Sequence, residues 1–134
     1  MRNKKQISFA KTINMQVYPF QLMISVGQND DELGAELDKH KDLNEESIRA
    51  CQYPSKYSPG KAVLTNTNLG VIRLRELPRL SSDYGVLAHE IFHMVTFVLE
   101  RAGLKMVVDV SCEAYAYLIG YLTEKIFDAM NEYY

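Results

Sequence analysis

The most constraining feature of the sequence is the pentapeptide His-Glu-Ile-Phe-His at positions 89–93, which lies inside a strongly helical stretch over 82–101. Residues four apart on a helix project from the same side, so His89 and His93 can hold one metal ion between them. Glu90 lies on the flank of that side, close enough to hold a water molecule beside the ion. The pattern therefore predicts a metal site with a general base next to it.

The flanks of the pentapeptide support this helix. Ser81, Ser82 and Asp83 are candidate N-caps, and Gly103 is a natural stop. The stretch is apolar nearly all round, which indicates a buried helix. Two histidines and a glutamate are costly to bury unless a partner satisfies them, and a metal ion would do so. The alternative is a pair of core histidines that only find hydrogen bonds.

A third metal ligand is expected on the next helix. Catalytic zinc usually takes three protein ligands and keeps one position for water. A second helix is predicted to begin near position 109 or 111, and a tight connection would make it an antiparallel neighbour of the first. Glu113 lies in its first turns and can face His93. Asp109 and Cys112 compete for this role, although Asp109 could instead accept the free ring N–H of a ligating histidine.

Two tyrosines follow on the same predicted helix. Tyr117 lies one turn after Glu113, and Tyr121 lies one turn further on. Their hydroxyls could donate to the oxyanion of a tetrahedral intermediate, and Tyr117 is the better placed of the two. Ordinary packing with the hydroxyl at the surface is the alternative for both.

The H-E-x-x-H motif, followed by Glu113 in the segment Ser-Cys-Glu-Ala-Tyr-Ala-Tyr at 111–117, resembles the gluzincin zinc metallopeptidases. The similarity is to their minimal, single-domain forms of bacterial and prophage origin, and it covers positions 60–127. The resemblance implies that His89, His93 and Glu113 bind zinc, that Glu90 is the catalytic base, and that the substrate is a peptide or protein. The metzincin pattern requires a histidine at position 99, which is leucine here.

Length and composition favour one ordinary globular domain. The chain has 134 residues, of which 47% are hydrophobic and 24% charged. This length and apolar content are enough for one hydrophobic core over 1–134 without stabilising disulfides or metals. The net charge of -2 gives no reason to expect a nucleic-acid partner. No long apolar region follows the basic start, so no membrane association and a cytoplasmic location are expected. Cys51 and Cys112 fit a reducing compartment, with a single disulfide left open.

The periodicity of the chain predicts an α+β fold, a minimal zincin-like domain. Strands are expected at 7–17, 21–26, 62–65 and 71–76, the last two as a hairpin, with helices over 29–40 and 44–51 and a loop over 52–60. A small twisted sheet would pack on the H-E-x-x-H helix and on the C-terminal ligand helix. Arg73 and Arg75 share one face of the last strand, which indicates an exposed edge strand. The resemblance implies that such a strand holds the substrate, so that the arginines would favour acidic substrates; the preferred alternative is that they only keep the protein soluble.

Three functions are compatible with these patterns. The preferred one is a zinc-dependent peptidase or amide hydrolase, with a protein partner for targeting as a further expectation. The first alternative is a zinc-binding but catalytically inactive phage or prophage accessory protein that binds a partner. The second is a purely structural helix pair without metal.

Overall fold

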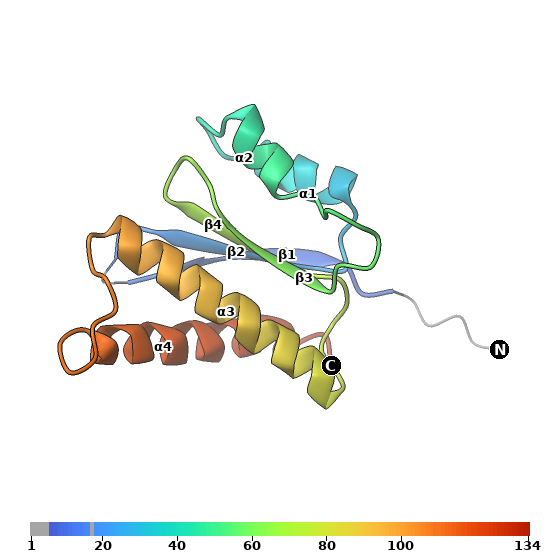
Figure 1. The fold of residues 1–134 in the computed structure, drawn as a ribbon. Helices are drawn as coiled ribbons and strands as arrows, with labels where there is room; N and C mark the ends of the chain where they lie inside the picture. Colours follow the sequence, from blue (N-terminus) through green and yellow to red (C-terminus); the bar gives the residue numbers. More distant parts are fainter. Residues whose placement is uncertain (1–5, 17) are drawn as a thin grey trace.

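The computed structural model describes residues 6–16 and 18–134, which form an α+β fold with one mixed sheet and four helices (Figure 1). The elements in chain order are β1 (Phe9–Asn14), β2 (Gln21–Val26), α1 (Asp30–Leu37), α2 (Glu45–Ala50), β3 (Gly60–Leu64), β4 (Leu69–Leu74), α3 (Ser81–Arg101) and α4 (Cys112–Asn131). The expected strands and helices are therefore all present. The basic residues 1–5 and position 17, at the end of the first expected strand, lie outside the described residues.

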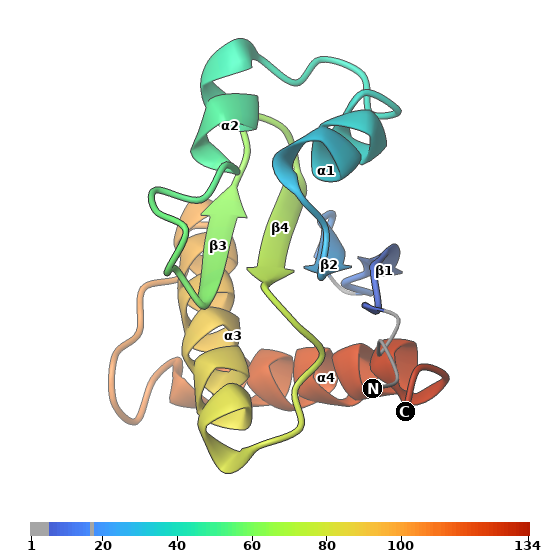
Figure 2. The ribbon, with the colours of Figure 1, turned by 90° about the vertical axis from the view of Figure 1, so that its right-hand side faces the viewer.

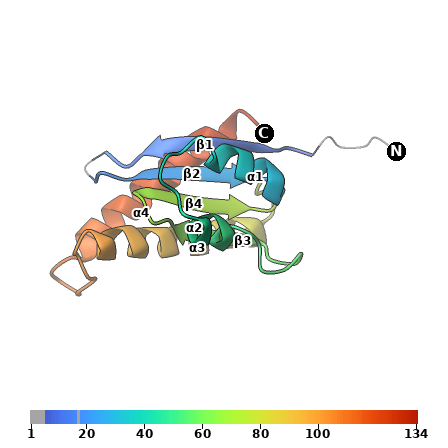
Figure 3. The ribbon, with the colours of Figure 1, turned by 90° about the horizontal axis from the view of Figure 1, so that it is seen from above.

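The strands lie in the order β1-β2-β4-β3 (Figure 3). The central strands β2 and β4 are parallel, with Gln21 opposite Leu69, and each edge strand runs antiparallel to its neighbour. The hairpin formed by β3 and β4 confirms the one predicted from the sequence. In β2 the residues from Leu22 to Val26 are all buried, so this strand is covered on both faces and not on one.

Helices cover both faces of the sheet (Figures 1 and 2). On one face α3 lies along β3 while α4 crosses towards β1, and this layer holds the larger core, which includes Ile72, Met94 and Leu122. On the other face α1 and α2 enclose a smaller core, which includes Leu33 and Val71. None of the helices in the described part of the chain is long and apolar enough to cross a membrane.

Local caps set the helix ends. The side chains of Asn29 and Asn44 accept the backbone N–H groups of Glu32 and Ser47, each at 2.8 Å, and so begin α1 and α2. Helix α3 begins at Ser81, one residue before the expected start. The carboxylate of Asp83 accepts hydrogen bonds from the backbone N–H groups of Arg79 and Leu80, just before the helix. Gly103, at φ +87°, ends α3 as predicted, because glycine adopts this backbone conformation without steric cost. Helix α1 ends at Leu37, before the predicted position 40.

The prediction that 71–76 is an exposed edge strand is wrong. Strand β4 lies between β2 and β3, and β3 is the edge strand on that side of the sheet. Arg73 is only 1% exposed, because α1 and α2 cover the sheet face that carries it. The alternation of apolar residues and arginines along β4 does not show that α1 and α2 form a layer on the arginine face.

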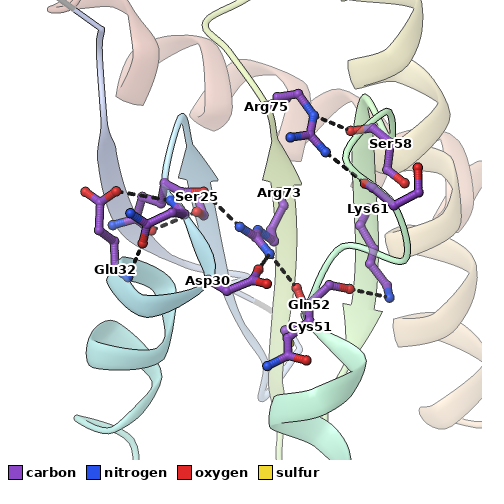
Figure 4. A network of polar contacts seen from close by, with 12 residues as sticks. Ser25, Asp30, Glu32, Cys51, Gln52, Ser58, Lys61, Arg73 and Arg75 are labelled. Carbon is purple, nitrogen blue, oxygen red and sulfur yellow. Dashed lines mark hydrogen bonds and ion pairs between the residues drawn. The ribbon is translucent and has the colours of Figure 1, made fainter.

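Arg73 joins the ends of β2 and α2 and the start of α1 to the sheet, and Arg75 joins the loop over 52–59 to it (Figure 4). The guanidinium of Arg73 donates to Asp30 Oδ1 at 2.6 Å and to the carbonyls of Cys51 and Gln28 at 2.9 and 2.8 Å. Arg75 donates to the carbonyls of Ser58 and Ser55. The ring of Tyr53 lies 3.9 and 4.3 Å from the two guanidinium groups. Because Arg73 is buried and Arg75 donates to loop carbonyls, the suggested preference for acidic substrates at an exposed edge strand loses its basis. Cys51 and Cys112 are both free thiols.

Candidate metal centre

The two histidines of the motif face each other on the solvent side of α3. Their Nε2 atoms lie 3.0 Å apart, and their ring centroids are 4.5 Å apart. Two tetrahedral zinc ligands, each about 2.0 Å from the ion, would place their nitrogens about 3.3 Å apart. The spacing is close to that of two ligands on one metal ion, and it is also the distance of a hydrogen bond between the two rings, which the metal-free alternative predicts.

The expectation that α3 is buried all round is wrong. Its core side carries Leu87, Ile91, Met94 and Val98, whereas the side chain of His89 is 66% exposed. His89 therefore has no burial cost for a metal to offset. The exposure has a different consequence, since a metal ion held here could be reached from solvent.

Glu90 occupies the opposite environment. Its side chain is only 9% exposed, and its Oε1 atom lies 3.7 Å from Nε2 of His89. Burial raises the pKa of the Glu90 carboxyl, and the neighbouring His89 and His93 partly oppose this rise. The buried carboxylate beside the two imidazole rings therefore has the position of a general base.

Gly60, at the start of β3, makes room for Glu90. A Cβ atom at this position would lie 3.2 Å from Glu90 Cγ and 2.9 Å from Val86 Cγ1. The sequence alone carries no signal for this role of Gly60, because only the fold shows that the end of the 52–60 loop meets the first half of α3. The absent side chain lets Glu90 pack against the backbone of the edge strand.

Substituting Gly60 with alanine is therefore expected to lower the free energy of unfolding by about 1–3 kcal/mol, the usual cost of overpacking. Urea unfolding followed by circular dichroism measures this change. Gly34→Ala is the matched control, because a Cβ at Gly34 has no neighbour within 4 Å. In a helix the alanine should leave stability unchanged or raise it. Equal stability of the two variants would contradict the close approach at Gly60.

Glu113 lies in the first turn of α4 and is exposed. Within 6–16 and 18–134, no group of three or more His, Cys, Asp or Glu side chains is close enough to hold a metal ion. The structure thus brings together His89, Glu90 and His93, and it does not place Glu113, Asp109 or Cys112 with them. The helical repeat predicted the histidine pair correctly, whereas the position of Glu113 depends on how α4 is rotated against α3.

The two tyrosines of α4 differ in their surroundings. The hydroxyl of Tyr121 donates to the carbonyl of Asn14 at 2.9 Å, which supports a packing role. Tyr117 is 57% exposed, so its hydroxyl is open to solvent on the surface of α4.

A groove of about 610 Å³ lies beside the histidine pair, between β3 and α3. Its lining residues are Ala62, Val63, Leu64, Phe97, Glu100 and Arg101. The ring of Phe97 stacks on that of His93 at a centroid distance of 5.8 Å, so the groove begins one helical turn from the pair. Phe97 was not among the residues predicted for the site. Its spacing of four from His93 on a helix is nevertheless a signal that the two rings lie side by side.

Comparison with protein-family models, with curated proteins and with solved structures found no match to this chain. The resemblance to gluzincins therefore depends on the H-E-x-x-H motif and Glu113. The chemistry of the site must be judged from its own geometry.

Proposed function

We propose that this chain is a zinc-dependent hydrolase of peptide or amide bonds. The observation that carries the proposal is the pair of imidazole nitrogens 3.0 Å apart on an exposed helix side, with the buried carboxylate of Glu90 adjacent to them. Zinc bound by such ligands supplies Lewis-acid chemistry, which lowers the pKa of water and polarises a carbonyl group.

The residues of the chain have distinct roles in this proposal. His89 and His93 bind the metal through their Nε2 atoms. Glu90 takes a proton from the attacking water and later delivers it to the leaving amine. The low exposure of Glu90 keeps bulk water away from its carboxylate, and packing on Gly60 holds that carboxylate in place. Tyr117 is the proposed donor to the oxyanion.

The free edge of β3 suits an extended substrate. Among the described residues β3 pairs only with β4, so its outer backbone groups have no strand partner. The other edge strand, β1, differs in that its side chains pack on the C-terminal residues: the ring of Phe9 stacks on Tyr133 at 3.9 Å, and Lys11 pairs with Glu132. Addition of a peptide strand to an open sheet edge is a common mode of recognition. We therefore place the scissile bond beside β3, next to Glu90.

Glu113 is the proposed third ligand, and it would have to join the histidine pair when the metal binds. Helix α4 packs against α3, so the carboxylate belongs to the neighbouring helix. Its exposure means that no buried contact must be broken for its side chain to move. The metal content of untagged protein and the dissociation constant for zinc test this assignment.

The wild-type chain is expected to bind about one zinc ion. Glu113→Ala should weaken binding by at least about tenfold, the lower end of the cost of losing even an outer-shell partner. Glu124→Ala, an exposed substitution further along α4, is the control and should bind like the wild type. No zinc uptake by the wild type would overturn the proposed function. Unchanged affinity in Glu113→Ala would overturn only the choice of third ligand.

A second candidate is metal binding without hydrolysis in a partner-binding protein. The link between α3 and α4 favours it, because Met106, Val107, Val108 and Val110 are each at least 50% exposed. The hydroxyl of Ser111 accepts the backbone N–H of Val107 at 2.8 Å, so the link is an ordered loop that presents apolar side chains. Zinc at full occupancy, with no cleavage of a peptide library, would favour this candidate over the hydrolase.

A further inference from the structure

We infer that Phe97 is a positioning residue for the proposed metal site: its ring holds the imidazole of His93 in the orientation that faces His89. The inference goes beyond the proposed function and rests on it only for the identity of the metal as zinc. It follows from the stacking of the two rings, from the place of Phe97 beside β3, and from how few other contacts orient the histidine pair in the described part of the chain.

The imidazole of His93 has one flat contact. Its ring lies nearly parallel to that of Phe97, with an interplanar angle of 18° and a centroid distance of 5.8 Å. Stacking at this distance is favourable for aromatic rings and depends on their relative orientation. Phe92 also lies near His93, but its ring is tilted by 57° at 6.4 Å, and Phe92 is 46% exposed. Phe97 is therefore the neighbour that restricts the plane of the His93 ring.

The sheet in turn restricts Phe97. This residue is half-buried and lines the groove between α3 and β3 together with Ala62, Val63 and Leu64. Helix α3 packs against β3 along this side. Because Phe97 follows His93 by four residues, the two side chains leave the helix on the same side, one turn apart. The orientation of His93 thus depends on the docking of α3 against β3.

Hydrogen bonds from elsewhere in the chain do not orient the two imidazoles. Within 6–16 and 18–134, the polar contacts of their ring nitrogens are the one between the two Nε2 atoms and the approach of Glu90 Oε1 to His89 Nε2, which at 3.7 Å is too long for a hydrogen bond. Metal affinity falls in proportion to the fraction of molecules in which both nitrogens face the ion. A residue that raises this fraction therefore strengthens metal binding without touching the metal.

The first measurement uses the metal-free protein. Nuclear Overhauser effects between ring protons of His89 and His93 report whether the two rings face each other, and the methyl shifts of Leu122 report whether the larger core is intact. Phe97→Leu keeps an apolar side chain in the groove and removes the flat ring. We expect the inter-ring signal to weaken while the Leu122 shifts stay at their wild-type values. Phe97→Tyr keeps the ring and should retain the signal.

Zinc affinity, measured by competition with a chromophoric chelator, is the second readout. Phe97→Leu should weaken it about two- to tenfold, the contribution of one stacked aromatic pair, whereas Phe97→Tyr should bind like the wild type. Phe92→Leu is the matched control and should change neither the inter-ring signal nor the affinity. An inter-ring signal that keeps its wild-type strength in Phe97→Leu, or that is lost equally in Phe92→Leu, would overturn the inference. The proposed function fails separately, by the absence of zinc uptake, because the inter-ring signal is measured without metal.

Discussion

Replacing Glu90 with glutamine is expected to preserve zinc binding and to reduce hydrolysis by roughly 10²- to 10⁴-fold, the usual contribution of a general base. Glutamine has the shape of glutamate and can keep the packing against Gly60. It cannot accept a proton from water, however. Zinc content and the rate of cleavage of a selected peptide, measured on the same preparation, check both parts of the expectation.

Glu46→Gln is the control for this experiment. Glu46 lies in the first turn of α2 and is exposed, on the sheet face opposite to α3. Its substitution should change neither zinc content nor rate. Full activity in Glu90→Gln would remove Glu90 as the base, whereas loss of zinc in that variant would make Glu90 a metal ligand instead.

The largest expected effect on stability comes from Arg73→Met. The substitution keeps much of the side-chain volume and removes the donors to Asp30 and to the carbonyls of Cys51 and Gln28. Buried acceptors that lose their partner cost about 1–3 kcal/mol each. Because Asp30 is 47% exposed and can be hydrated, we count only the two carbonyls and expect a total loss of about 2–6 kcal/mol in the free energy of unfolding.

Urea unfolding of Arg73→Met and of Arg49→Met separates the buried network from a general effect of losing an arginine. Arg49 is exposed in the last turn of α2, so its replacement should change stability by less than about 0.5 kcal/mol. Wild-type stability in Arg73→Met would show that the apolar contacts of methionine replace the network fully, as happens for some buried ion pairs.

Much of the fold could be predicted from local signals. Asn29 and Asn44 as caps, Gly103 as a stop, and the hairpin of β3 and β4 each depend on a few neighbouring residues. The facing of His89 and His93 likewise follows from the helical repeat alone. Such features need no knowledge of the rest of the chain.

The incorrect predictions concern contacts between distant parts of the chain. Arg73 looked exposed because nothing in β4 shows that α1 and α2 cover its face, or that Asp30 and Cys51 would accept its hydrogen bonds. The exposure of His89 depends on which side of α3 meets the sheet. The proximity of Glu113 to the pair depends on the rotation of one packed helix against another. Helical and strand periods do not determine these quantities.

The parallel pairing of β2 with β4 also has a consequence for how fast the chain folds. Positions 21 and 69 must meet before the centre of the sheet exists. Closing so long a loop lowers the entropy of the chain before the contacts between the two strands can offset that loss. Helices α3 and α4, which are neighbours in sequence, can associate without this step. His89 and His93 therefore face each other as soon as α3 forms, whereas Glu90 acquires its buried environment only when β3 docks with the completed sheet.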